Sequence, residues 1–136
     1  MEELSMVIPN DAQYIGVARL AVGGLASKMN FNTEDVEDIK VCLSEACNTV
    51  IQSKKLGGKI INIYFRVEPD GLVIKVGAEG NALDERIWEK YHEIGKTFVE
   101  TLMDDVKYIK QKKKGTSVEM TKYINEIDDN YLRYKH

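Results

Sequence analysis

The sequence predicts an α/β (α+β) two-layer sandwich, in which an antiparallel-rich sheet of about five strands carries helices on one face. Long stretches repeat apolar residues at helical spacing, shorter ones alternate apolar and polar residues, and turn residues separate them. Their order is strand, two helices, hairpin, helix, hairpin. At 136 residues the chain is long enough for one domain, expected over 1–125, and a charged tail follows over 126–136.

Composition narrows the class of protein. Hydrophobic residues make up 43% of the chain, charged residues 30%, and the net charge is −3. This balance is typical of a soluble domain and argues against nucleic acid as the main partner, because that binding needs clustered cations. No apolar run reaches membrane-spanning length and the N-terminus is acidic, so we expect no membrane partner and a cytoplasmic location.

The two cysteines and two histidines predict no metal or disulfide chemistry. Cys42 and Cys47 fall in one helix with Cα atoms about 8 Å apart, beyond the reach of a disulfide. With only His92 and His136 besides, there is no plausible zinc set. We expect both cysteines to be small buried hydrophobic residues.

The first third of the chain predicts a strand over 4–8, ended by Pro9, and then a helix over 11–29. Asn10 or Asp11 is the expected cap. The apolar stripe of this helix comprises Ile15, Ala18, Val22, Leu25 and Met29.

Polar and small residues occupy the other faces of this first helix. Gly16, Gly23 and Gly24 each disfavour a helix by roughly 1 kcal/mol against Ala, which indicates that another backbone or a partner approaches closely. Arg19 points away from the apolar stripe, and from the pattern alone a solvated surface arginine is the simpler interpretation.

The next helix, expected over 34–53 with Asn32 or Thr33 as its cap, contains the pair Glu45 and Thr49. These two residues lie one turn apart at the edge of the buried stripe. A carboxylate and a short oxygen-bearing side chain can orient a water and hold hydrated Mg²⁺ in nucleotide chemistry. From spacing alone, a polar helix flank is the favoured alternative.

The second half predicts a hairpin from strands 59–67 and 72–76, a helix over 84–103, and a closing hairpin from 106–109 and 116–124. Gly77 to Asn81 forms a backbone-exposing loop after the first hairpin. The three helices are expected on one face of a mixed or antiparallel sheet.

Several segments in the same order resemble the bacterial anti-sigma-factor serine kinases of the GHKL (Bergerat-fold) ATPase superfamily. They are Ala18 to Met29, Ser44 to Cys47, Glu100 to Val106, Gly115-Thr116 and Met120 to Tyr123. The resemblance runs from about Ser5 to Ile124 and implies a Bergerat-like mixed sheet with helices on one face. Such proteins bind a sigma factor, and with Mg-ATP they phosphorylate a STAS-domain anti-anti-sigma factor on serine.

In the helix motif, the resemblance implies that Glu45 is the general base. The family then places a Mg²⁺-binding asparagine four residues later, where this chain has Thr49. Asn48 is adjacent but points about 100° away around the helix, so Thr49 or Asn48 would have to serve the metal.

The loops of the implied nucleotide site also depart from the family. Ala78 stands where the family's adenine-binding aspartate is expected, and Glu93 replaces the first glycine of the phosphate loop. Gly80, Gly95 and Thr116 are kept, while the lid between 80 and 95 is shortened. The lost adenine acceptor alone would cost about 1–3 kcal/mol of binding. We therefore expect a vestigial ATP site.

The leading hypothesis is a regulatory protein that binds a sigma factor or a STAS-domain antagonist, with Mg-ATP or Mg-ADP binding weakened or lost. Arg19 and Gly23 are the expected partner-binding residues. The alternative is an active serine protein kinase with an unusual ATP site. A weaker third hypothesis is a subunit that homodimerises through the first helix. A phosphorelay role for His92 beside Glu93 is disfavoured.

Overall fold

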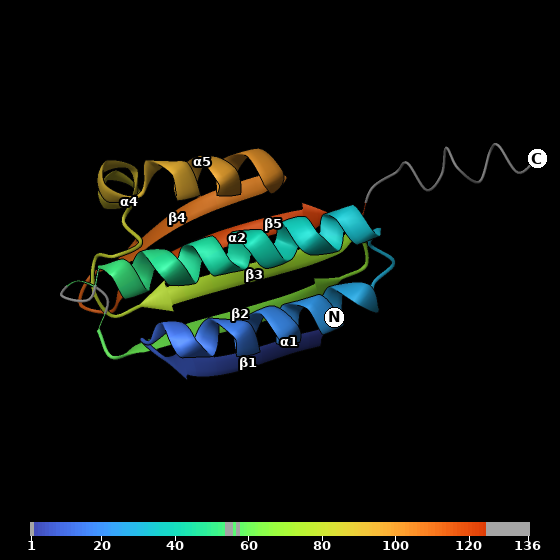
Figure 1. Cartoon of the computed structure of the whole chain (residues 1–136), viewed down its shortest axis with the longest axis horizontal. Coiled ribbons are helices and arrows are strands. Elements are labelled where there is room, and N and C mark those ends of the chain that lie inside the picture. Colours follow the sequence, from blue (N-terminus) through green and yellow to red (C-terminus); the bar gives the residue numbers. More distant parts are fainter. Residues whose placement is uncertain (1, 54–55, 57, 125–136) are drawn as a thin grey trace, which may run out of the picture.

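The computed structural model describes residues 2–53, 56 and 58–124, which fold into two layers (Figure 1). One layer is a 5-stranded sheet with strand order β1-β2-β3-β5-β4. The strands are β1 (Glu2–Pro9), β2 (Ile60–Glu68), β3 (Gly71–Ala78), β4 (Asp105–Gln111) and β5 (Gly115–Tyr123).

Every pairing in this sheet is antiparallel. The resemblance implies a mixed sheet, and that part of the prediction is wrong. The antiparallel sheet, which the prediction also allowed, is the one observed. Strand β5 can lie between β3 and β4 because the helices that follow β3 carry the chain to the edge strand β4 before it returns.

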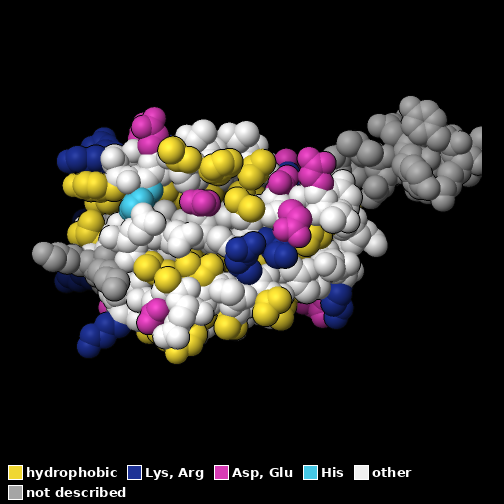
Figure 2. Space-filling model, viewed as in Figure 1, with side chains coloured by type: hydrophobic (Ala, Val, Ile, Leu, Met, Phe, Trp, Pro, Cys, Tyr) yellow, Lys and Arg dark blue, Asp and Glu magenta, His cyan; other side chains and the backbone are white. Residues whose placement is uncertain are grey.

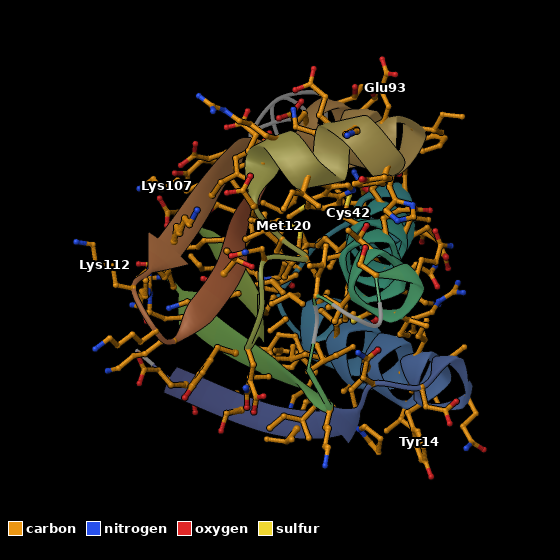
Figure 3. All side chains as sticks on the ribbon, turned by 90° about the vertical axis from the view of Figure 1, so that its left-hand side faces the viewer. Tyr14, Cys42, Glu93, Lys107, Lys112 and Met120 are labelled. Atoms are coloured by element: carbon orange, nitrogen blue, oxygen red, sulfur yellow. The ribbon has the colours of Figure 1, made fainter. Side chains whose placement is uncertain are left out.

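The second layer consists of helices on one face of the sheet, as predicted. They are α1 (Ile15–Ser27), preceded by the 3-10 turn η1 (Ala12–Tyr14), then α2 (Thr33–Gln52), α4 (Glu85–Tyr91) and α5 (Glu93–Leu102). A side view places Cys42 and Met120 between the layers and leaves the other face of the sheet bare (Figure 3). None of the described helices is both long and apolar enough to cross a membrane.

The predicted helix over 84–103 is wrong at one point, because it is broken at His92, whose φ and ψ are −143° and 50°. The chain turns there and restarts as α5, while the backbone N–H of His92 still donates to Trp88 at 2.7 Å. Trp88, Val99 and Leu102 keep one helical phase across the break, so periodicity alone could not reveal it.

Helix α2 lies in the middle of the helical layer and supplies much of the core. Ile39, Leu43 and Val50, along one face of this helix, are fully buried. Asn32 caps the helix by accepting a hydrogen bond from the Asp35 backbone N–H at 2.7 Å. Other large side chains that are fully buried include Trp88, Ile61, Ile63, Leu72, Ile74, Leu83, Met120, Val22 and Val76.

The cysteines behave as predicted. Cys42 and Cys47 are both buried and free. Burial raises the pKa of each thiol to about 12, so both stay neutral and pack as small hydrophobic residues. The predicted tail over 126–136 lies outside the described residues.

Candidate functional site

The adenine side of the implied site lies where β3 ends and β5 begins. Ala78 and Thr116 are register partners there. The Thr116 hydroxyl donates to the Gly80 carbonyl at 2.6 Å and accepts from the Leu83 backbone N–H at 3.1 Å. Leu83 is fully buried, and Ala78 is 4% exposed. The hydroxyl that the resemblance assigns to nucleotide is thus engaged by the chain's own loop.

The glycines beside this loop are required by close backbone contacts. Gly115 has a φ of +102°, and a side chain there would collide with the carbonyl oxygens of Ala78 and Glu79. A side chain at Gly80 would collide with the backbone of Leu56. Both glycines therefore have a structural reason to be present that is independent of any ligand.

The phosphate side is formed by α2 and the first turn of α5. A Cβ on Gly95 would lie 2.6 Å from Glu45 Oε2, so the half-buried Glu45 carboxylate fills the space that a side chain at 95 would need. It lies beside the N-terminal turn of α5, which has no side-chain cap. The positive end of the helix dipole favours a carboxylate there, and the exposed Glu93 in the same turn is favoured likewise.

The two metal-ligand candidates face different surroundings. Thr49 is 2% exposed, and its hydroxyl donates to the Glu45 carbonyl at 2.8 Å within α2. Asn48 is half-buried. Among the described residues, no group of three or more His, Cys, Asp or Glu side chains could hold a metal ion. A Mg²⁺ ion at this site would thus depend mainly on Glu45, Asn48 and its own waters.

Trp88 closes the space beside Gly95. Its indole is fully buried and packs edge-on against Tyr108 of β4, with ring centroids 6.1 Å apart and planes at 83°. The indole Nε1 lies 3.7 Å from the position of a Cβ on Gly95 and has no hydrogen-bond partner.

A charged network, which the sequence analysis missed, fixes α5 to β4. The Lys96 ammonium, only 10% exposed, lies 3.0 Å from the Glu100 carboxylate and 3.6 Å from that of Glu85. The Tyr108 hydroxyl donates to Glu100 at 2.7 Å. The i,i+4 spacing of Lys96 and Glu100 was the available sequence signal, but nothing local indicates Tyr108.

The pKa shifts follow from this network. Burial alone would raise the pKa of Glu100, but the hydrogen bonds from Tyr108 and Lys96 outweigh it, so the pKa is lowered. Burial would lower the pKa of Lys96, but the hydrogen bond and charge of Glu100 raise it. Burial and the bond to Glu100 also raise the pKa of Tyr108.

The partner-binding candidates lie apart from these groups, on α1, which flanks α2 on the side away from α5 (Figure 1). Arg19 is exposed and lines a groove of about 570 Å³ between α1 and α2. The Lys40 stem covers Gly23, since a Cβ there would lie 3.2 Å from Lys40 Cδ. Cationic side chains lie between the two helices, with apolar side chains nearby (Figure 2). Leu20, 77% exposed, lines the groove.

Comparisons with known proteins agree on one family. Residues 8–122 match the family model described as the histidine kinase-like ATPase domain. The serine-protein kinase RsbW of Bacillus subtilis is 32% identical, over 90% of this chain and 86% of its own length. The protein of the same name from Oceanobacillus iheyensis is 34% identical, over 95% of this chain and 94% of its own length.

The contact at Gly95 gives a first prediction. Gly95→Ala should change the free energy of unfolding by less than about 1 kcal/mol, because the added methyl displaces only the flexible end of the Glu45 side chain while Ala favours the helix over Gly. In the double variant with Glu45→Ala no carboxylate has to move, so Gly95→Ala should be more favourable there, and the difference is the coupling measured by urea unfolding. Gly24→Ala is the matched control: it has open space and should stabilise α1 by up to about 1 kcal/mol. Additive effects of the two changes would contradict the contact.

The Glu100 network gives a second prediction. Since its pKa is lower in the folded state than in the unfolded state, Glu100 stabilises the fold above the ordinary glutamate pKa, and this stabilisation is lost as the pH falls through the folded value. Urea unfolding of Glu100→Gln should therefore vary less with pH across the acid range than that of wild type. Glu3→Gln, exposed on β1, is the control, and identical profiles for wild type and Glu100→Gln would refute the role of the network.

Proposed function

Because the chain belongs to the histidine kinase-like ATPase domain family, we propose that it is an anti-sigma-factor-like regulatory protein with weakened or lost nucleotide binding. The RsbW relatives and the family match confirm the resemblance predicted from the sequence. The proposed partners are a sigma factor, a STAS-domain antagonist, or both. One observation carries the proposal. Side chains that the resemblance assigns to ATP binding contact other parts of the protein instead, whereas the α1 face is exposed to solvent.

The engaged groups support weak nucleotide binding in three ways. Ala78 offers a methyl group where the family has an adenine acceptor, and the Thr116 hydroxyl already has two backbone partners. Glu45 occupies the space at Gly95. Opening the site would break these contacts, expose the buried Trp88 and disrupt the Lys96 network, so ATP binding would have to offset all of these losses.

The open α1 face supports partner binding. A Cβ at Gly16 or Gly24 would meet nothing within 4 Å, so packing within the chain does not require these helix glycines. Leu20, 77% exposed, lines the same groove as Arg19. A guanidinium beside an exposed apolar side chain and backbone open to close approach is suited to a specific protein contact. A homodimer through the same face and a cytoplasmic location stay predictions.

An active serine kinase is the second candidate, and one observation favours it. Glu45, the implied general base, is present and only half-buried, and the RsbW relatives are themselves serine-protein kinases by name. In that case the lid segment over 81–95 would have to move away from Gly95 before Mg-ATP could bind.

A binding experiment tests the partner surface. Arg19→Ala should weaken binding of the cell's sigma factor or STAS-domain protein by at least about tenfold, because central interface arginines are frequent hot spots. The fold should be unaffected, since Arg19 lies outside the core. The matched control is Arg86→Ala, an exposed arginine on α4. Equal affinities for wild type and Arg19→Ala would place the partner surface elsewhere.

A phosphotransfer experiment separates the two candidate functions. The protein is mixed with the STAS-domain protein and radiolabelled Mg-ATP, with a serine kinase of the RsbW type as positive control. We expect no label on the STAS-domain protein, and an affinity for either partner that does not change with ATP. Label that disappears in Glu45→Gln would establish the kinase instead.

A further inference from the structure

The helix-free face of the sheet contains a glycine that packing within the chain does not require. Gly77 lies within β3, where a glycine weakens a strand unless something approaches it closely. Its φ is not positive, unlike those of Gly58 and Gly115. A Cβ at 77 would make only ordinary contacts, 3.6 Å from Ser117 Cβ and 3.9 Å from two carbonyl oxygens. The chain would thus accommodate a side chain at this position.

A hollow of about 260 Å³ lies over Gly77. Asn62 on β2 and Ser117 on β5 are the register partners of Gly77 and form opposite walls. Because side chains alternate along a strand and Ile61, Ile63 and Val118 face the core, these walls stand on the bare face of the sheet. The remaining side-chain lining includes Tyr64, Lys75, Glu79, Gln111 and Lys114.

The charge around the hollow is positive, although the whole chain carries −3. Among the described residues, neither Lys75 nor Lys114 forms a salt bridge. The one acidic lining residue, Glu79, leans toward Gly58, with its Oε2 2.9 Å from the position of a Cβ there. Lys107 and Lys112 extend from the β4–β5 hairpin on the same side of the molecule (Figure 3).

Glu119 offsets only part of this positive charge. It is the register partner of both Lys75 and Lys107, so one carboxylate faces two ammonium groups. The Asn62 and Gln111 amides and the Ser117 hydroxyl add hydrogen-bond donors around the floor. The missing side chain at Gly77 leaves room for an oxyanion close to the sheet, and the surrounding side-chain donors and cations would hold it, since the Gly77 backbone is paired with β2 and β5.

We propose that this hollow binds the phosphate group of a small soluble phosphate monoester. The phosphate lies over Gly77 between Asn62 and Ser117, and Lys75 and Lys114 neutralise its charge. The volume is slightly below the roughly 300–1,000 Å³ of pockets for drug-sized ligands, so the ligand is a small metabolite. The site is on the opposite face from the helices and apart from the α1 surface, and its edge includes Ala78 and Thr116, so it adjoins the adenine side of the implied nucleotide site.

The test is an NMR titration of the full chain with glycerol 3-phosphate, up to about 20 mM, to detect affinities in the millimolar range. We expect saturable shifts of the Gly77 and Ser117 amides, and none with glycerol. Lys75→Ala and Lys114→Ala should each weaken binding by about tenfold, as for the loss of a charge-assisted hydrogen bond. Lys28→Ala, exposed beyond α1, is the control and should bind like wild type.

Filling the hollow gives an independent arm. Gly77→Val should abolish the shifts while the melting temperature stays close to that of wild type. If that variant does not fold, Gly77→Ala replaces it, and the lysine variants remain decisive. Absence of saturation, equal binding of glycerol, or unchanged binding by both lysine variants would overturn the proposal. So would binding only to vesicles containing phosphatidic acid, which present the same group on a lipid.

Discussion

At Gly95, helix α5 passes the Glu45 carboxylate of α2 so closely that a Cβ there would lie 2.6 Å from Oε2. A side chain at 95 would displace the end of the Glu45 side chain. Trp88 lies beside the same turn, with its Nε1 3.7 Å from that Cβ position, and packs against Tyr108. The Lys96 network holds α5 to β4 on its other side. A carboxylate at the helix N-terminus and an indole in the core stabilise the closed arrangement without a ligand.

This arrangement separates the roles of the three surfaces. Between the lid segment and α2, side chains of the protein contact one another, whereas the α1 face presents Arg19 and glycines without packing partners to solvent. A partner can therefore bind α1 whether or not the lid segment moves. The bare face of the sheet contains the hollow over Gly77, whose edge includes Ala78 and Thr116 beside the loop that Thr116 holds. On the two proposals made above, the α1 surface for a protein partner and the hollow for a small phosphate share no residues.

The sequence predicted the fold well because burial is periodic. The five alternating stretches became five strands, and the stripe through Leu43 became the centre of the core. The arrangement of the candidate site was harder to predict from the sequence. Sequence reasoning identified Glu45 and Gly95, but not that they touch, because that contact depends on how two helices cross. The break at His92 keeps the helical phase, and the bond from Tyr108 to Glu100 joins separate elements. The sequence predicts Gly77 in a loop, but it lies within β3, because its pairing with Ser117 joins residues far apart in the chain.

Calorimetric titration of the full chain with Mg-ATP, and in parallel with Mg-ADP, tests the central claim that the family's nucleotide site is closed by the protein's own side chains. The account predicts no saturable binding tighter than about 1 mM, since opening the site must undo the contacts of Thr116, Glu45 and Trp88. The fluorescence of Trp88, the only tryptophan in the chain, should stay unchanged through the titration. A micromolar dissociation constant for either nucleotide would contradict the account.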